Sequence, residues 1–420
     1  MSNSTMSNAA EPQLIDRILA AVDDVLDNAR EDFHAINRLG EGNEGREVGV
    51  VEKTLQQLRT THAFGLTATA EARGEHPAAG LRAAIETTRR LARIDGSLAQ
   101  IPQSHFVFSR YVGAAQRNNE AAGGYEREVL DGTALVANAQ VDRDPVRAET
   151  GVDGRTRLNG HKIFCTGSPY ADILAIVIGG KDVVFVPADA EGISIDDDWH
   201  ATGQEFTGSG SVRLEDVDVT GLAVQALSVG GGGEASGGGA GGAGGAGGAG
   251  GADAGDAGVA DDGVIHHGAF AQALHAGIDL GLFEGAVEIA HELARLPRDA
   301  EQLPESQATL LGEIDVSLFT AQAAYGALLD SLGRPAEDSQ EVALSVTRAK
   351  LAIQDAALAS VSKLFEVAGS AGYTATRALD RHWRDLRVHT LHDKRQNKLR
   401  LLGEHVGAEV ALPLDGKLGG

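Results

Sequence analysis

The spacing of apolar residues changes character twice along the chain. Up to about residue 127 it has a helical period, with Leu14, Ile18, Val22 and Leu26 on one helix face. From residue 130, short β-branched runs separated by Gly, Asp and Pro predict strands. After residue 262, long Ala- and Leu-rich helical patterns return. This uncommon order predicts an α+β protein with an antiparallel sheet or small barrel between two helical units.

These changes divide the chain into a helical domain (residues 11–128), a central antiparallel β domain (129–225) and a C-terminal helical bundle (263–412). A Gly/Ala-rich insert (226–262) separates the last two. Its GGA period of three resembles collagen, but the tract contains no proline, which the collagen helix requires. We therefore predict a flexible, solvated and disordered insert.

The chain is strongly acidic, with 60 acidic against 36 basic residues and a net charge of −24. Such a field repels nucleic acid and anionic lipid, so neither is expected as a partner. Low Lys beside high Asp and Glu favours an acidic proteome in a salt-rich cytoplasm over simple solubility. The N-terminus has no signal-peptide pattern, and no apolar run approaches ~20 residues. We expect a soluble, cytoplasmic protein without a membrane partner.

Cysteine and glycine patterns exclude two kinds of site. Cys165 is the one cysteine, so neither an intrachain disulfide nor a cysteine metal cage can form. We expect it to be a buried strand residue. The glycine-rich tract has no GxGxxG after a strand, so a nicotinamide site is not expected.

The segment RHWRDLRVHTLHDK, residues 381–394, concentrates three histidines on a basic, helix-compatible stretch. On a helix, His389 and His392 would occupy neighbouring faces. A solvated helix face, a metal site and an acid–base centre are all compatible with this pattern. We predict no metal, because no acidic residue has HExxH spacing and there is no Cys cluster. Histidine suits acid–base chemistry because its unperturbed pKa is about 6.5.

Three strings resemble the acyl-CoA dehydrogenase superfamily: NGHKIFCTG, GSGSVRLEDVDV and FEVAGSAGYTATRALDRHWRD. This resemblance implies an N-terminal helical domain, a β domain and a four-helix bundle. The strings ANAQVDRDP, GAFAQALHAGIDLGLFEGA and LDRHWRDLRVHTLHD are similar to its branch of reduced-flavin-dependent monooxygenases, which includes oxygenases of organosulfur acquisition.

The resemblance to that branch implies a reaction and its partners. Reduced flavin (FMNH2) would add O2 to give a C4a-hydroperoxide, which oxygenates a small organosulfur or similarly soft substrate. The implied cofactor is reduced FMN, with FAD as the alternative. A separate NAD(P)H-dependent flavin reductase would supply it, and a homotetramer is implied.

The resemblance also assigns roles to individual residues. His392 would face the peroxide as the acid–base group, with His389 as its partner and His105 approaching from the helical domain. Other assigned residues are Asn138, Phe164 and Thr166 at the flavin ring, Lys162 as a nearby charge, Gly369 and Ser370 at the phosphate or ribityl chain, and Trp199 as a substrate wall. His105 could instead be a hydrogen-bonded helix residue, Thr166 an ordinary strand threonine, and Trp199 a surface cap.

Two other functions remain open at this point. One is an FAD-dependent acyl-CoA dehydrogenase with Asp393 in the place of the family's glutamate base, and the other is a non-catalytic scaffold. The family usually has a basic residue near the start of the second bundle helix, where this chain reads SQATLLGEID. Arg334 or Arg348 would then have to supply the charge for the flavin phosphate.

Overall fold

A computed structural model describes residues 11–37, 44–68, 77–117, 125–222, 224–227, 265–294, 303–334, 338–373 and 379–414. Nearly all of the Gly/Ala-rich insert, residues 228–262, therefore lies outside the described residues. Its predicted disorder stays a prediction.

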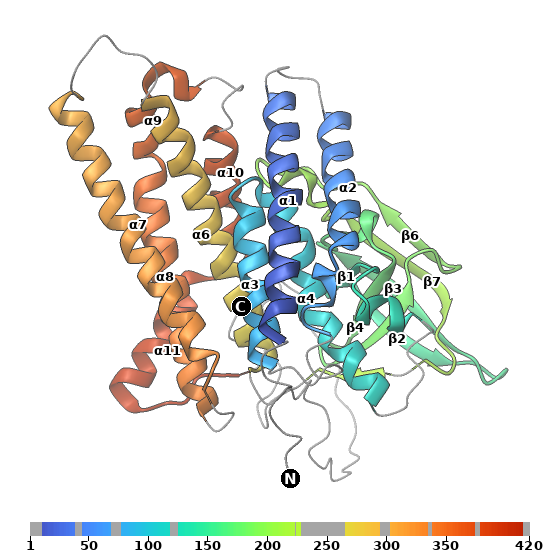
Figure 1. The fold of residues 1–420 in the computed structure, drawn as a ribbon. Coiled ribbons are helices and arrows are strands. Elements are labelled where there is room, and N and C mark those ends of the chain that lie inside the picture. The colour runs from blue at the N-terminus through green and yellow to red at the C-terminus, as the bar shows by residue number, and fades with distance from the viewer. Residues whose placement is uncertain are drawn as a thin grey trace, which may run out of the picture.

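The first part of the chain is helical, as its period predicts. Its helices are α1 (Glu11–Asn37), α2 (Glu44–Thr60), α3 (Pro77–Ala92), α4 (Gly96–Arg117) and α5 (Glu126–Leu130), with a short 3-10 turn, η1 (Ala63–Gly65). The apolar face of α1 is buried through Val22, Leu26 and Phe33. Figure 1 places α1 to α4 between the β domain and the C-terminal helices.

Two four-stranded sheets form the β domain. The first has the order β1-β4-β5-β8, from β1 (Val136–Ala139), β4 (Ile173–Ile178), β5 (Asp182–Pro187) and β8 (Val224–Ala226). The second has the order β2-β3-β7-β6, from β2 (Val141–Thr150), β3 (Thr156–Ile163), β7 (Ser211–Asp218) and β6 (Ile193–Asp196). Short 3-10 turns, η2 (Ser168–Tyr170) and η3 (Glu205–Thr207), lie in the connections.

One strand pair departs from the predicted antiparallel sheet. β1 and β4 are parallel, with Val136 opposite Ile173. The chain leaves the first sheet after β1, forms the β2–β3 hairpin of the second sheet, and returns as β4 in its original direction. Parallel neighbours need such a long crossover, whereas every other described pair is antiparallel.

Strand β4 is apolar throughout because both of its faces are buried. Ile173, Ala175 and Val177 pack in the large core shared with the helices. The alternate residues Leu174 and Ile176 pack in a second core between the two sheets. Successive strand side chains point to opposite faces, so a strand covered on both sides reads as a continuous apolar run.

The C-terminal part is a set of long helices around α6. They are α6 (His267–Ala294), α7 (Glu305–Ser331), α8 (Ser339–Val361), α9 (Lys363–Ala368), α10 (Leu379–His389) and α11 (Arg395–Ala408), with a 3-10 turn, η5 (Gly369–Tyr373). Helix α6 contacts α3, α8 and α10, and Figure 1 shows it between the outer α7 and the N-terminal helices. Nearly all of α6 from Gly268 to Val287 is buried, and this stretch is mainly apolar, as expected of a helix that is covered on all sides.

Glycine allows α6 to approach α3 closely. A Cβ placed on Gly281 would lie 2.1 Å from the carbonyl oxygen of Arg89, and one on Gly285 would lie 2.4 Å from that of Arg93. These distances are shorter than any normal contact, so only glycine fits at these two positions. The close packing fixes α6 against the N-terminal domain.

Asp385 of α10 joins three parts of the fold. Its two carboxylate oxygens accept hydrogen bonds from the backbone N–H of Gly96, at the start of α4 (3.2 Å), and of Gln204, in the β domain (2.6 Å). The neighbouring Arg384 donates to the carbonyl oxygen of Thr202. This contact fixes α10 relative to both other domains.

No helix in the described ranges is both long enough and apolar enough to cross a membrane.

Candidate acid–base site

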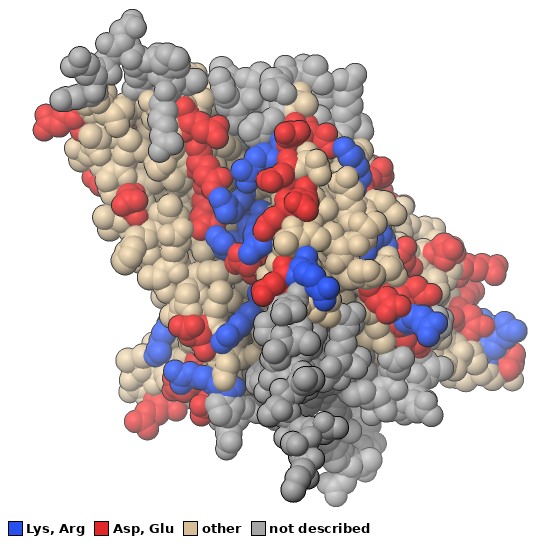
Figure 2. Space-filling model, in the orientation of Figure 1, with Lys and Arg blue, Asp and Glu red and all other residues tan. Residues whose placement is uncertain are grey.

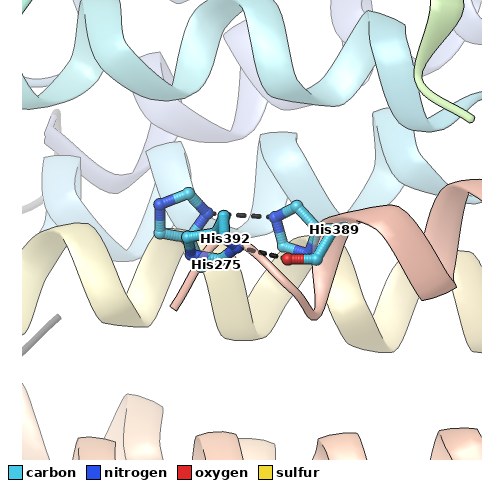
Figure 3. A group of neighbouring side chains, drawn as sticks. All are labelled: His275, His389 and His392. Carbon is cyan, nitrogen blue, oxygen red and sulfur yellow. Dashed lines mark hydrogen bonds between the residues drawn. The ribbon is translucent and has the colours of Figure 1, made fainter. Parts of the chain in front are cut away.

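Three histidine rings converge where α10 meets α6 (Figure 3). His275 lies in the middle of α6, and its Nδ1 is 3.0 Å from Nε2 of His389. The rings of His275 and His392 have centroids 4.0 Å apart. The structure thus brings His389 and His392 together, and it adds His275, to which the sequence assigned no role.

His392 does not lie on the same helix as His389. Helix α10 ends at His389, and a tight turn follows, in which the N–H of His392 approaches the carbonyl oxygen of His389. Nδ1 of His392 contacts that same carbonyl oxygen. The expected helical spacing is therefore wrong, but the turn still places the two ring centroids 4.9 Å apart.

A buried carboxylate orients His389. Asp279, one turn after His275 on α6, accepts a hydrogen bond from Nδ1 of His389 at 2.6 Å. Its second oxygen accepts from the side-chain amide of Gln354 on α8 at 3.1 Å. Because the carboxylate holds the proton on Nδ1, the lone pair of His389 lies on Nε2 and faces His275.

A second charged group lies beside His392. Asp393 is almost fully buried and forms ion pairs with Lys398 at 2.5 Å and Lys350 at 3.3 Å, two lysines that are also buried. Its carboxylate is 3.6 Å from Nε2 of His392. With Asp279 included, two carboxylates balance two ammonium groups around the three rings.

This environment shifts several pKa values. Burial, followed by the charges of His392 and Lys350, lowers the pKa of His275 well below its usual value. Burial and the charge of Lys350 lower the pKa of His392 to about 3. Burial opposes ionisation of Asp393, but Lys350, His392 and Lys398 outweigh it and lower its pKa to about 2. His275 and His392 are therefore both neutral near pH 7.

The sequence contained a signal for His275 and Asp279. They lie four residues apart, on one helix face, in a stretch (268–287) whose only other polar side chains are Gln272 and Glu284, so both are expected to be buried. Buried ionisable groups are rare unless they are paired, and such a pair on an apolar helix predicts a buried polar network. Lys350 and Lys398 carried no comparable signal, because isolated lysines on helices are usually exposed.

A second group of predicted residues lies in the β domain. The Phe164 side chain is 55% exposed on a backbone with positive φ, and its ring packs edge-on against Trp199 at 6.1 Å. Two residues later, the hydroxyl of Thr166 bonds that of Ser209 at 2.8 Å. On β1, the buried Oδ1 of Asn138 has no hydrogen-bond partner among the described residues. A non-glycine residue at positive φ with an exposed ring is typical of a functional turn.

Trp199 connects this group to α10. Its indole N–H donates to the carbonyl oxygen of Gln204 at 2.9 Å, and the N–H of Gln204 donates to Asp385. Asp385 and His389 are one helical turn apart on α10, a rise of about 6 Å. The aromatic pair and the histidines are thus positioned by the same helix.

Two of the predicted site residues are fully buried and use their polar atoms in hydrogen bonds within the fold. The ring of His105 is fully buried, with Nδ1 accepting from the N–H of Val136 and Nε2 donating to the carbonyl oxygen of Phe64. Lys162 is also fully buried and binds two backbone carbonyl oxygens and Asp142. Neither has a free polar atom for a flavin or substrate, so we do not assign them to the reaction. His105 instead fixes β1 to the helical domain.

The predicted phosphate-binding residues lie at the end of α9. Gly369 ends this helix with φ 62°, and a Cβ placed there would meet nothing within 4 Å. Ser370 is exposed. Arg334 and Arg348, considered as substitutes for the family's basic residue, are exposed as well. Cys165 is buried as expected.

Comparison with known proteins locates the histidine cluster in a family domain. The family "Acyl-CoA dehydrogenase, C-terminal domain" matches residues 273–396, which include all three histidines and Asp279. The chain is 27% identical to the dibenzothiophene monooxygenase of Rhodococcus erythropolis over 77% of this chain and 79% of that protein. It is 26% identical to a probable FMNH2-dependent monooxygenase, SfnC, of Pseudomonas putida over 75% of this chain and 78% of that protein.

A solved structure has the same fold. The dibenzothiophene monooxygenase TdsC of Paenibacillus sp. A11-2, in complex with FMN and indole, superimposes with a TM-score of 0.73 at 21% identity, covering 96% of this chain and 100% of that chain. The helical, β and helical parts occur in the order that the sequence predicts. The chain is thus similar to the acyl-CoA dehydrogenase family over its C-terminal helices, and over most of its length to the dibenzothiophene monooxygenases and the SfnC protein.

Proposed function

We propose that the protein is a two-component flavin-dependent monooxygenase. It would accept reduced FMN from a separate NAD(P)H-dependent flavin reductase and use O2 to oxygenate a small organosulfur or similarly soft compound. The observation that carries this proposal is the cluster of His275, His389 and His392, with Asp279 orienting it. The similarity to SfnC, a probable FMNH2-dependent monooxygenase, supports the use of FMNH2.

The surroundings of Asp393 argue against the dehydrogenase alternative. A base that removes an α-proton from a thioester must reach the substrate. Asp393 is buried and pairs with two buried lysines, Lys350 and Lys398. These ion pairs hold its carboxylate inside the fold, away from a substrate.

Several described residues fit a flavin. The partnerless Oδ1 of Asn138 can accept a hydrogen bond from a ring N–H, and the exposed Phe164 offers an aromatic face. Open space around Gly369 permits a phosphate or ribityl chain to approach the backbone. Thr166 can donate its hydroxyl proton to a flavin oxygen once its bond with Ser209 rearranges. When bound, the reduced flavin would supply the activation of O2.

The protein's own residues would then control protons and water. His392 has its Nδ1 on a backbone carbonyl, so Nε2 can accept a proton from the substrate side or return one. His389 and Asp279 keep His275 and His392 in fixed orientations, as a carboxylate–histidine pair does in other enzymes. The α10 connection through Asp385 and Gln204 would position Trp199 as a wall of the substrate pocket.

A homotetramer belongs to the same proposal. Helix α7 is the outer helix of the bundle, and it exposes Val316 (65%) and Phe319 (70%) on one side. Figure 2 shows few charged side chains over this helix, although the chain carries a net charge of −24. An apolar strip on an acidic protein is typical of a subunit interface.

The test compares two reactions of the purified protein. Under anaerobic conditions, a panel of acyl-CoA thioesters should leave the spectrum of FAD- or FMN-loaded protein unchanged. FMNH2 and O2, supplied with an alkanesulfinate or an aromatic thioether, should yield the oxygenated product. Bleaching of the flavin by a thioester would instead establish the dehydrogenase.

Substitutions test which side chains take part in the oxygenation. His392→Ala should lower the rate of oxygenation by about 10²–10⁴-fold, the usual contribution of a general acid–base group. His200→Ala, at an exposed position outside the cluster, is the matched control and should keep the wild-type rate. A His392→Ala protein with full activity would remove the histidine cluster from the reaction.

A further inference from the structure

The three histidine rings have the spacing of a metal-ligand set. Among the residues that the structure describes, His275, His389 and His392 each place one ring nitrogen within 4.8 Å of the other two. The facing nitrogens of His275 and His389 are 3.0 Å apart. A tetrahedral ion bound at about 2.0–2.1 Å keeps its nitrogen ligands roughly 3.3 Å apart, so closing the widest gap needs ring movements of about 1–1.5 Å.

Hydrogen bonds set which nitrogen carries the lone pair in two of the three rings. Nδ1 of His389 donates its proton to a hydrogen bond with Asp279, so Nε2 of His389 keeps its lone pair and can act as a metal ligand. Nδ1 of His392 faces a backbone carbonyl oxygen, so it too carries the proton and leaves the lone pair on Nε2, 3.6 Å from the Asp393 carboxylate. A carboxylate that holds the remote nitrogen of a ligating histidine is the usual outer partner of a metal site. Gln354 in turn fixes this carboxylate.

We propose that His275, His389 and His392 bind a divalent late transition-metal ion such as Zn²⁺. Imidazole nitrogens suit Zn²⁺, Cu²⁺ and Ni²⁺ and do not suit Mg²⁺ or Ca²⁺. Three protein ligands leave the fourth position of a tetrahedral ion for water. On binding, the proton that lies between His275 and His389 moves from Nδ1 to Nε2 of His275. All three ligands are then neutral imidazoles, and binding of the ion releases no proton.

The surroundings permit entry and balance the charge. The His392 side chain is 31% exposed, so an ion can reach the ring nitrogens from solvent through this edge of the cluster. Asp279 and Asp393 supply two negative charges nearby, which offset the ammonium groups of Lys350 and Lys398. An incoming cation therefore meets no uncompensated positive charge.

The bound ion and the proposed acid–base role exclude each other. The ion would occupy the lone pairs that accept or return protons, so metal-loaded protein should lose oxygenation activity. This consequence rests on the proposed function, whereas binding of the ion does not. Measurements of binding and of activity therefore distinguish a failure of one proposal from a failure of the other.

Calorimetric titration of the full-length, tag-free protein with Zn²⁺ tests the site, and Co²⁺ provides a visible spectrum. We expect one Zn²⁺ per chain, and an intense d–d band of four-coordinate cobalt. His392→Gln should lower the affinity at least about tenfold and abolish the band. Asp279→Asn should lower the affinity about 10–100-fold, as the loss of an outer-shell carboxylate does.

His200→Gln, at an exposed position away from the cluster, is the matched control and should bind Zn²⁺ as the wild type does. Thermal unfolding of the metal-free variants establishes that each is folded. His392 is the one ring of the three with substantial exposure, 31% for its side chain, so its replacement by the similarly sized Gln is the mildest change to the cluster. Equal Zn²⁺ affinity in wild type and His392→Gln, or a weak six-coordinate cobalt spectrum in the wild type, would overturn the proposal.

Discussion

Two lysines share one buried carboxylate beside His392. Asp393 pairs with Lys350 and Lys398, and all three side chains are at most 2% exposed. Breaking such a group by removing one partner leaves charges buried without compensation, which is far more costly than losing an exposed pair.

Asp393→Asn should therefore destabilise the protein by about 3–5 kcal/mol, because two buried ammonium groups lose their counter-ion. The measurement is the urea midpoint at pH 7. Asp355→Asn, which removes an exposed pair with Arg395, is the control and should cost about 0–1 kcal/mol. Equal effects of the two substitutions would show that the buried pairs contribute no more than a surface pair.

The sequence predicts which residues gather at the site better than it predicts the hydrogen bonds that each buried residue makes. His389 and His392 were identified because their segment is distinctive, and the structure brings them together. For His105 the alternative of a hydrogen-bonded helix residue was open, but neither its partners nor those of Lys162 were predictable, because these hydrogen bonds go to backbone atoms that are distant in sequence. His105 binds Phe64 and Val136, and Lys162 binds Val177. Spacing along the chain carries no information about such contacts.

Elements were easier to predict than contacts. The helical and strand periods identified the three parts of the chain because long, strongly periodic segments dominate local structure. The parallel pairing of β1 with β4 was missed, since direction depends on the path of the chain between strands. The end of α10 at His389 was missed too, because no glycine or proline marks it.

The packing of α6 on α3 depends on glycine. Gly281→Ala should destabilise the protein by about 1–3 kcal/mol, because its Cβ would overlap the carbonyl oxygen of Arg89 and force the helices apart. Thermal and urea unfolding measure the loss.

Gly326 on α7 provides the matched control, since a Cβ there would meet nothing within 4 Å. Gly326→Ala should be neutral or stabilise the protein by up to about 1 kcal/mol through its higher helix propensity. A Gly281→Ala protein that is as stable as Gly326→Ala would contradict the close-packing argument.

The connection made by α10 predicts a pH dependence of stability. Burial, with the negative charge of Asp95, raises the pKa of Asp385 to about 7. Between about pH 4 and 7 the native state then holds a proton that the unfolded state has released, so stability falls as the pH rises through this window.

Asp385→Asn should remove this contribution and flatten the change in unfolding free energy between about pH 4 and 7. Asp380→Asn, an exposed position on the same helix, should leave the slope unchanged. Urea unfolding at several pH values measures both. Parallel pH profiles for wild type and Asp385→Asn would show that Asp385 titrates normally.

At the scale of the whole molecule, the exposed strip on α7 predicts assembly. Phe319→Glu places a charge in the proposed interface and should convert the proposed homotetramer to smaller species, as measured by light scattering after size-exclusion chromatography. Val152→Glu, at the fully exposed tip of the β2–β3 hairpin, should leave the mass unchanged. A wild-type monomer would contradict the proposed assembly directly.

One hydrophobic core runs through all three parts of the molecule. It contains Val22 of α1, Ile173 of β4, Phe283 of α6 and Leu386 of α10, so the boundaries read from the sequence do not separate independent cores. A fragment that ends near residue 225 would lose α6 and expose the apolar surfaces of α3 and α4 to water. Such a fragment should precipitate when expressed alone, and the intact chain should melt in a single calorimetric peak. Anyone dividing this enzyme for engineering would have to keep its two helical ends together.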